Sequence, residues 1–317
     1  MISTDRNIFD KNSAVALRQI EYAKKYDEVH IIVFANKTYK ETSLGSNIFI
    51  YPTRSSSRWL YVFDALKLGR FIVEKRKIES VTCQDPFETG LVGALIKSRH
   101  QVSLELQIHT DIGSPYFQNF NFLNKIRTKV SKYTLAKANH IRVVSDRIKE
   151  YVRTYVDPAI IEVRPIAVDI EKIKNAPITV DLHKKYPQFS KIILVVSRLE
   201  KEKNVALAIE AFIKVLDTAP SSGLVIVGSG REMETLKKSA PNSVVFEGWQ
   251  NDTSSYFKTA DCLLVTSLYE GYGVVFEEAQ AAGLPIVTTD VGIAREAGAT
   301  IVGWKPEEVA DGILQKL

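Results

Sequence analysis

The chain has 317 residues, of which 45% are hydrophobic and 25% are charged, and its net charge is +5. This composition is ordinary for a globular protein and excludes collagen-like, low-complexity and largely disordered chains. No apolar run approaches the ~18 residues that span a bilayer, and at about 150 residues per domain the length predicts two domains. Cys83 and Cys262 lie far apart in apolar runs, so we expect reduced core thiols in a cytoplasmic protein.

Short β-branched runs alternate with amphipathic stretches in the first half of the chain. The runs predicted as strands are 29–35, 48–51, 80–83, 102–108, 140–144 and 160–163. The stretches predicted as helices are 13–26, 59–76, 89–97, 123–138 and 147–155. The alternation breaks at 173–190, a polar stretch with two prolines, which we interpret as a linker. It separates a predicted N-terminal domain, 1–172, from a C-terminal domain, 173–317.

The alternation resumes after this stretch. Strands are predicted at 192–197, 224–227, 244–247, 262–265 and 285–288, and helices at 205–216, 231–239, 254–259 and 275–282. Strand–helix alternation in both halves predicts the α/β class, with two Rossmann-like, doubly wound parallel-sheet domains. Because such domains bind ligands beyond the carboxyl ends of their strands, we expect the two to face a central cleft that holds the site.

The charge is unevenly distributed along the chain. Up to Lys174 there are 28 Lys and Arg against 19 Asp and Glu, a net of +9, and the remainder carries −4. The basic bias concentrates in 125–153, directly after the aromatic residues Tyr116, Phe117, Phe120 and Phe122. Aromatic and basic side chains together favour peripheral contact between 116–153 and an anionic membrane, and a solvated helix face is the alternative. No zinc-finger spacing, RNP-type motif or basic zipper is present, so we expect no nucleic-acid partner.

The segment from Ser267 to Val287 is the most informative for function. Gly271 and Gly273 allow a tight turn and close approach to a ligand, and the helix that follows directs free N–H groups at it. Glu270 precedes this helix and Glu278 lies eight residues later. Carboxylates at these places are suited to accept hydrogen bonds from sugar or ribose hydroxyls. The alternative is that acidic residues simply favour a helix N-terminus.

A second informative segment follows the strand at 192–197. Arg198 lies at the strand end and Lys203 opens the next helix, so both can face one site. Two cations there can neutralise a diphosphate and stabilise the charge that develops as it leaves. A solvated loop of mixed charge is the alternative.

In their order and separation, these segments resemble the GT-B glycosyltransferases, most closely the large retaining family 4. That family has an Arg…Lys pair after the first strand of its C-terminal domain and a Glu-x7-Glu motif after a later strand. Here the pair is Arg198 and Lys203, and the motif is Glu270 and Glu278. The intervening 227–230, 246–249 and 289–292 also fit. The resemblance is strong over 190–317 and looser in the first half.

The resemblance implies a role for each matching residue. Arg198 and Lys203 would hold the diphosphate of a nucleotide-sugar donor, Glu270 would bind the transferred sugar, and Glu278 the ribose. The remaining implied contacts are Gly271, Tyr272, Gly273, Val274 and Val275 to phosphate and sugar, Gly248 and Trp249 to the base, and His109, after the strand at 102–108, to the reacting sugar. Gly228 and Gly230 are better explained by a tight turn.

The chain departs from the family's pattern in several places. The stretch 8–13 lacks the glycine-rich loop that the family often has after its first strand. No Asp-x-Asp is present, so we expect no cofactor and no metal, with the basic pair neutralising the diphosphate. The first strand is a stub, and relatives usually continue beyond the helix near Pro306. If their crossover helices are absent, we expect looser cleft closure and weaker activity.

The resemblance therefore implies a hexosyltransferase that moves a sugar from a nucleotide-diphosphate sugar to a glycan or lipid-linked acceptor, with retention. It would act in the cytoplasm, peripherally at the inner membrane face. One alternative is an isomerase of the same architecture, such as a nucleotide-sugar 2-epimerase, which needs no acceptor. Another is a non-catalytic module that binds nucleotide sugars.

Overall fold

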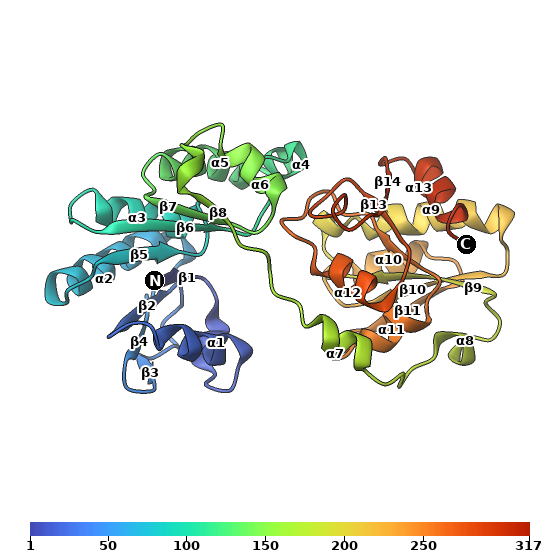
Figure 1. The fold of residues 1–317 in the computed structure, drawn as a ribbon, viewed down its shortest axis with the longest axis horizontal. Helices are drawn as coiled ribbons and strands as arrows, with labels where there is room; N and C mark the ends of the chain where they lie inside the picture. The colour runs from blue at the N-terminus through green and yellow to red at the C-terminus, as the bar shows by residue number, and fades with distance from the viewer. The chain divides into compact units, whose positions relative to one another are not determined.

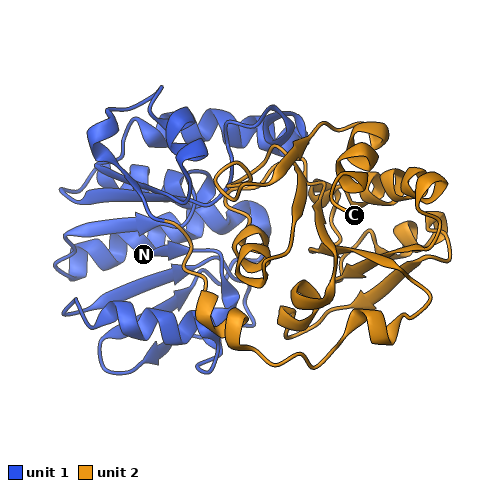
Figure 2. Ribbon diagram, turned by 45° about the vertical axis from the view of Figure 1, so that its right-hand side comes forward, with its two compact units in different colours: residues 1–164 blue, residues 165–317 orange.

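The computed structural model describes residues 1–317, which form two compact units, residues 1–164 and 165–317 (Figures 1 and 2). Each unit contains one β-sheet with helices packed against it. Every strand pair is parallel except β3 with β4. The predicted α/β class with two parallel-sheet domains is confirmed.

Unit 1 follows the order predicted from the alternation. The expected stub of a first strand is β1, and the prediction missed the short strand β3. Its strands are β1 (Ile2–Ser3), β2 (Val29–Val33), β3 (Thr42–Leu44), β4 (Ile48–Pro52), β5 (Ser80–Cys83), β6 (Ser103–Ile108), β7 (His140–Val143) and β8 (Ile161–Val163). Its helices are α1 (Ala14–Ala23), α2 (Tyr61–Lys75), α3 (Glu88–Lys97), α4 (Pro115–Asn119), α5 (Phe122–Leu135) and α6 (Asp146–Val152), with 3₁₀ turns η1 (Arg6–Phe9), η2 (Arg58–Leu60) and η3 (Pro158–Ile160).

The helices of unit 1 cover both faces of its sheet, which has the order β3-β4-β2-β1-β5-β6-β7-β8. Alternate side chains of β2 pack against the helix layers on opposite faces of the sheet, because successive side chains of a strand point to opposite faces. Ile31 and Val33 pack in one core cluster with α1, whereas Ile32 faces Gly69 of α2. Helix α3 packs against α2 on one side and α5 on the other, so these three helices form one layer.

Unit 2 has a six-stranded sheet in the order β11-β10-β9-β12-β13-β14. Its strands are β9 (Lys191–Val196), β10 (Ser222–Val227), β11 (Val244–Gly248), β12 (Cys262–Val265), β13 (Ile286–Thr289) and the unpredicted β14 (Thr300–Val302). Its helices are α7 (Ile170–Asn175), α8 (Leu182–Lys185), α9 (Val205–Thr218), α10 (Met233–Ser239), α11 (Ser254–Thr259), α12 (Val274–Ala282) and α13 (Pro306–Leu314), with the 3₁₀ turn η4 (Lys201–Lys203).

The polar stretch 173–190, interpreted above as a linker, packs on unit 2 instead. Helix α7 contacts α12, and the buried side chains of Leu182 and Phe189 belong to the core of this unit. The backbone N–H of Thr179 donates to Ser255 Oγ at 2.9 Å, and that of Leu182 donates to Thr259 Oγ1 at 3.2 Å. These contacts join segments more than 70 residues apart, so the local composition did not indicate them.

Both cysteines are buried and unpaired, as expected of core thiols. None of the helices combines the length and the apolar content needed to cross a bilayer.

Helix α9 provides a direct test of the unit 2 core, because adjacent residues on it differ in burial. Phe212 is fully buried, whereas Ile213 is 44% exposed. We expect Phe212→Ala to lower the free energy of unfolding of unit 2 by about 3–5 kcal/mol, because it removes buried ring surface and leaves a cavity. Ile213→Ala is the matched control and should change it by less than about 1 kcal/mol. Urea unfolding followed by circular dichroism measures both, and equal effects would contradict the described packing.

Candidate functional site

The strand order of unit 2 brings the two predicted motifs to one edge of its sheet. The chain leaves β9 toward β10 on one side, and β12 pairs with β9 on the other, so the strand order reverses between β9 and β12. Ligands of doubly wound sheets bind at such a reversal, beyond the carboxyl ends of the strands. Arg198 and Lys203 follow β9, and Glu270 follows β12. The predicted residues therefore lie in the two loops at this switch point.

Lys203 and Glu270 bind each other across the switch point. The Lys203 ammonium donates to Glu270 Oε1, and the two side chains are only 15% and 14% exposed. Ser267 Oγ also donates to Glu270 Oε1, at 2.8 Å. An amine held against a carboxylate in this shielded setting interacts more strongly than an exposed pair. The arrangement places a cation and a hydroxyl-binding carboxylate side by side.

Backbone contacts fix the two loops relative to each other. The Leu268 N–H donates to the Glu202 carbonyl at 2.8 Å, and Thr266 Oγ1 donates to the Asn204 carbonyl at 3.0 Å. Asn204 has a φ of 49°, a left-handed conformation that Asn tolerates better than most residues and that ends η4 just before α9. This turn directs Lys203 toward the β12 loop.

Gly228 and Gly230 hold the loop after β10 tightly against the loop after β9. A Cβ on Gly228 would lie 1.9 Å from the Ser197 carbonyl oxygen, and one on Gly230 would lie 2.2 Å from that of Leu199. The Leu199 N–H donates to the Ser229 carbonyl at 2.9 Å. The two glycines thus allow close backbone packing, in line with the turn explanation. Because the contacts are to Ser197 and Leu199, this packing fixes the backbone on both sides of Arg198.

Arg198 is much more open to solvent than Lys203. Its side chain is 66% exposed and donates to Glu202 Oε1 at 3.2 Å. An exposed pair of this kind contributes little to stability and is readily exchanged for a stronger anionic partner. Arg198 is therefore free to turn toward a diphosphate.

The loop from Gly271 to Val275 brings backbone, rather than side chains, to the site. Gly273 has a φ of +85°, a left-handed conformation that favours glycine, and α12 begins at the next residue. The Tyr272 ring is buried, and its hydroxyl donates to Glu277 at 2.7 Å. Its carbonyl accepts from the Ile293 N–H at 2.9 Å. The N-terminal N–H groups of α12 are thus held at the switch point, where they favour an anion.

Glu278 lies on α12, and its carboxylate forms no hydrogen bond within the chain. Burial raises the pKa of Glu278 above its ordinary value, because the charged form loses hydration. A half-buried carboxylate without a protein partner is suited to accept hydrogen bonds from a diol.

Gly248 ends β11 and Trp249 follows it, on the far side of β10 from β9. Gly248 has a φ of +70°, and its carbonyl accepts from the Gly228 N–H at 2.7 Å, so this loop is joined to the loop after β10. The Trp249 ring is 68% exposed. An exposed indole at a strand end offers a flat surface on which a base can stack.

Glu247, next to Gly248, anchors a cluster that the sequence did not reveal. Its carboxylate accepts from the Lys185 ammonium at 2.6 Å, from the Tyr186 hydroxyl, and from the Tyr256 hydroxyl at 3.2 Å. Burial alone would raise the pKa of Glu247, but hydrogen bonds from Lys185 and Tyr186 outweigh it and hold the pKa below its ordinary value. Lys185 and Tyr186 lie in the stretch interpreted as a linker, which is why they were missed.

His109 belongs to unit 1, whereas the other predicted site residues belong to unit 2. It directly follows β6, at the carboxyl edge of that sheet. Partial burial lowers the pKa of His109, and the cations Arg142 and Arg18 lower it further. The imidazole is therefore neutral at pH 7 and can both donate and accept a hydrogen bond.

No three His, Cys, Asp or Glu side chains gather in a geometry that could hold a metal ion. The expectation that neither metal nor cofactor takes part stays a prediction.

Known structures share this fold over nearly the whole chain. HepE of Anabaena in complex with UDP and glucose matches with a TM-score of 0.72 at 18% identity, over 99% of this chain and 88% of its own. Sucrose-phosphate synthase of Thermosynechococcus elongatus matches with a TM-score of 0.74 at 18% identity, over the same shares. The two units therefore have the GT-B fold.

Sequence comparisons identify the family. The model of the glycosyltransferase family 4 matches residues 19–172, and that of the glycosyl transferases group 1 matches 190–317. The chain belongs to the family 4-like GT-B glycosyltransferases, which confirms the resemblance.

Curated relatives match part of the chain. UDP-Gal:alpha-D-GlcNAc-diphosphoundecaprenol alpha-1,3-galactosyltransferase of Escherichia coli is 33% identical over 148 residues, 43% of this chain and 38% of the relative. Alpha-monoglucosyldiacylglycerol synthase of Streptococcus pneumoniae is 25% identical over 240 residues, 68% of this chain and 53% of the relative. The matched part thus spans about half or less of the length of these relatives.

The raised pKa of Glu278 gives a testable pH dependence for nucleotide binding. As the pH falls from 7.5 to 4.5, the ordinary pKa of a Glu carboxyl, Glu278 gains a proton earlier than an exposed Glu and loses the charge that would attract ribose hydroxyls. We expect UDP affinity, measured by calorimetry, to fall roughly tenfold through this step. Glu278→Gln should bind weakly at both pH values and lack the step.

The phosphates of UDP also titrate in this range, so the difference between wild type and Glu278→Gln is the quantity to compare. Glu210→Gln, on the exposed side of α9, is the matched control and should keep the wild-type profile. Identical profiles for wild type and Glu278→Gln would contradict the ribose role.

Proposed function

We propose that the chain transfers a hexose from a nucleotide-diphosphate sugar to a glycan or lipid-linked acceptor, with retention of anomeric configuration. The observation that carries the proposal is the Lys203–Glu270 pair at the switch point of unit 2. It sets a cation for the diphosphate beside a carboxylate for the sugar, in front of the N-terminus of α12. The roles assigned above to Arg198, Glu278 and the 271–275 backbone complete the donor site.

The reaction breaks the bond between the anomeric carbon and the diphosphate oxygen. Arg198 and Lys203 stabilise the negative charge that develops on this oxygen. The acceptor hydroxyl attacks from the same face of the sugar, forms the new glycosidic bond, and gives its proton to the leaving diphosphate. Glu270 acts by binding sugar hydroxyls, since its carboxylate is already engaged by Lys203 and Ser267 and is not arranged as a nucleophile. His109, neutral at pH 7, would contact the reacting sugar from unit 1.

The relatives support the classes of donor and acceptor. The solved HepE complexes contain UDP, UDP-glucose, or UDP with glucose. The relative from Escherichia coli is named for a diphosphoundecaprenol acceptor, and the one from Streptococcus pneumoniae for a diacylglycerol product. A lipid-linked acceptor at the cytoplasmic membrane face is therefore the form of the proposal that we favour.

A transfer assay tests the proposal. Purified protein is incubated with radiolabelled UDP-sugars and GDP-sugars and a detergent-dispersed lipid-linked sugar, and transferred and free sugar are counted. We expect Lys203→Met and Glu270→Gln each to lower kcat at least about 100-fold, as loss of one charge-stabilising group does in other enzymes. Lys201→Met, an exposed lysine in the same short turn, is the matched control and should retain activity.

The outcomes separate the alternatives. Transfer with retained configuration supports the proposal, and an inverted product contradicts the retaining mechanism. Epimerised nucleotide sugar formed without an acceptor would establish the isomerase instead. Donor binding without turnover for any donor would establish the non-catalytic module.

The segment 116–153 is the proposed peripheral contact with an anionic membrane. Within it, Phe117 is buried against Phe87, whereas Phe122 is 79% exposed at the start of α5, and strand β7 lies in the sheet. We place the contact on the outer side of α5, where Lys125, Lys129 and Lys132 are exposed.

Charge reversal on α5 tests this contact. Lys125→Glu with Lys129→Glu should lower binding to vesicles containing phosphatidylglycerol by roughly tenfold or more, since each cation near an anionic surface contributes about 1 kcal/mol. Sedimentation with vesicles measures it, and Lys40→Glu, an exposed lysine after β2, is the control. Unchanged binding of the α5 variant would contradict the contact.

A further inference from the structure

The outer face of helix α2 exposes two aromatic rings among its charged side chains. Its inner face, with Ala65, Gly69 and Ile72, is buried, and the missing side chain of Gly69 lets Ile96 of α3 approach closely. On the opposite face, Phe63 is 67% exposed and Phe71 is 58% exposed. A helix that packs on a sheet normally turns charged and polar residues to solvent. The outer face of α2 is therefore unexplained by the fold.

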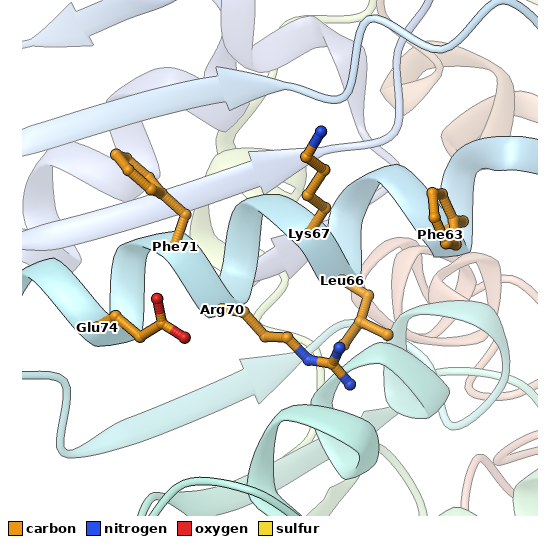
Figure 3. Close-up of a pocket in the computed structure, with 6 residues that line it drawn as sticks. All are labelled: Phe63, Leu66, Lys67, Arg70, Phe71 and Glu74. Carbon is orange, nitrogen blue, oxygen red and sulfur yellow. The ribbon is translucent and has the colours of Figure 1, made fainter.

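The two exposed rings of α2 lie in one stripe with a lysine between them. Phe63, Lys67 and Phe71 follow each other at intervals of four residues, so they lie above one another on the helix. Figure 3 shows these three along one edge of the helix and Leu66, Arg70 and Glu74 along the other, and together they line a shallow hollow. The preceding turn η2 extends the stripe with Trp59, which is 90% exposed, and Leu60, which is 41% exposed.

Unpaired cations accompany the stripe. Residues 58–77 contain six Lys and Arg against two Asp and Glu. Neither Lys67 nor Arg70 forms an ion pair; Lys67 is exposed, whereas Arg70 Nε is buried without a hydrogen-bond partner. Aromatic side chains on a helix flanked by free cations are typical of segments that lie in a membrane interface, the rings at headgroup depth and the cations at the phosphates. Protein–protein interfaces, in contrast, are depleted in lysine.

The stripe begins at the edge of the sheet where unit 1 is expected to bind its ligand. Trp59 follows β4, and α2 then runs back along the sheet to the start of β5, so its first turn lies at the carboxyl edge. The exposed Phe122 and Leu123 at the start of α5 lie at the same edge, because α5 also connects two parallel strands of this sheet. Both exposed apolar groups are thus gathered beside the acceptor side of the unit.

We propose that the outer face of η2 and α2 docks on an anionic lipid bilayer, with Trp59, Phe63 and Phe71 inserted at headgroup depth. This inference rests on the proposed function for its biological sense, since docking there brings a lipid-linked acceptor to the carboxyl edge of unit 1. The docking itself requires neither donor nor turnover. It adds a second, aromatic contact to the basic one proposed for α5.

Vesicle binding without donor tests the proposal. The probe is vesicles of phosphatidylcholine with 30% phosphatidylglycerol, and pure phosphatidylcholine vesicles are the comparison. We expect the triple variant Trp59→Ser, Phe63→Ser, Phe71→Ser to bind the anionic vesicles roughly tenfold or more weakly than wild type, because three inserted rings are lost. Leu17→Ser with Ile20→Ser, which removes exposed apolar residues from α1 on the other face of the sheet, is the matched control and should bind as wild type.

Trp59 fluorescence provides a second readout. Its emission should shift to shorter wavelength when anionic vesicles are added, and Trp59→Ser should abolish the shift. Because all three substituted rings are exposed, circular dichroism should show a folded variant, and transfer to a detergent-dispersed acceptor should be retained. If the wild type binds vesicles but transfers no sugar, the proposed function is wrong and the docking proposal still stands.

Two results would overturn the docking. One is equal vesicle binding by wild type and the triple variant, with no Trp59 shift. The other is a wild-type dimer, detected by light scattering, that the triple variant converts to monomer while vesicle binding stays negligible. That outcome would assign the stripe to contact with a second copy of the chain.

Discussion

The charge pair between Lys203 and Glu270 is the interaction on which the candidate site depends. It joins the loop after β9 to the loop after β12, the two loops that diverge at the switch point of unit 2. Both side chains are largely shielded, so removing one partner would leave the other charge poorly solvated. Backbone bonds from Leu268 to Glu202 and from Thr266 to Asn204 support the same juxtaposition. The pair therefore requires the parallel strand order, and the close packing at Gly228 and Gly230 then sets the position of Arg198 beside it.

Local patterns were sufficient for most of the fold. Continuous apolar runs such as β9, β10 and β12 are buried on both faces, which makes them readable as central parallel strands. The short strands β3 and β14 have three residues each and carry no periodicity, so only pairing with neighbouring strands defines them. The prediction of a linker at 173–190 was wrong for a related reason. Its polar residues are held by hydrogen bonds to Ser255 and Thr259, and its few apolar residues, such as Leu182, pack in a core built elsewhere in the chain.

The site shows the same division between local and distant information. The spacing of Glu270 and Glu278 is local, so their placement before and within α12 followed from the sequence. The pairing of Glu270 with Lys203 depends on strand order, and the cluster around Glu247 depends on a segment that looked like a linker. The sequence also did not indicate which aromatic side chains at 116–122 point inward and which point to solvent. Phe117 turns inward from α4, and Phe122 turns outward at the start of α5, because a new helix begins after Asn121.

The two units carry net charges of opposite sign, and the ligands proposed for them are attracted over different distances. The second part of the chain carries a net charge of −4, yet the ligand proposed for it is a diphosphate. Its attraction must therefore come from Arg198, Lys203 and the N-terminus of α12 at close range, since screening limits exposed charges to about 8 Å at physiological salt. The first part, with +9, can attract a surface that is itself densely charged, where many weak contacts add. Charge alone would make that contact non-specific. In the proposed docking, the exposed rings of Trp59, Phe63 and Phe71 would fix which face of unit 1 meets the lipid.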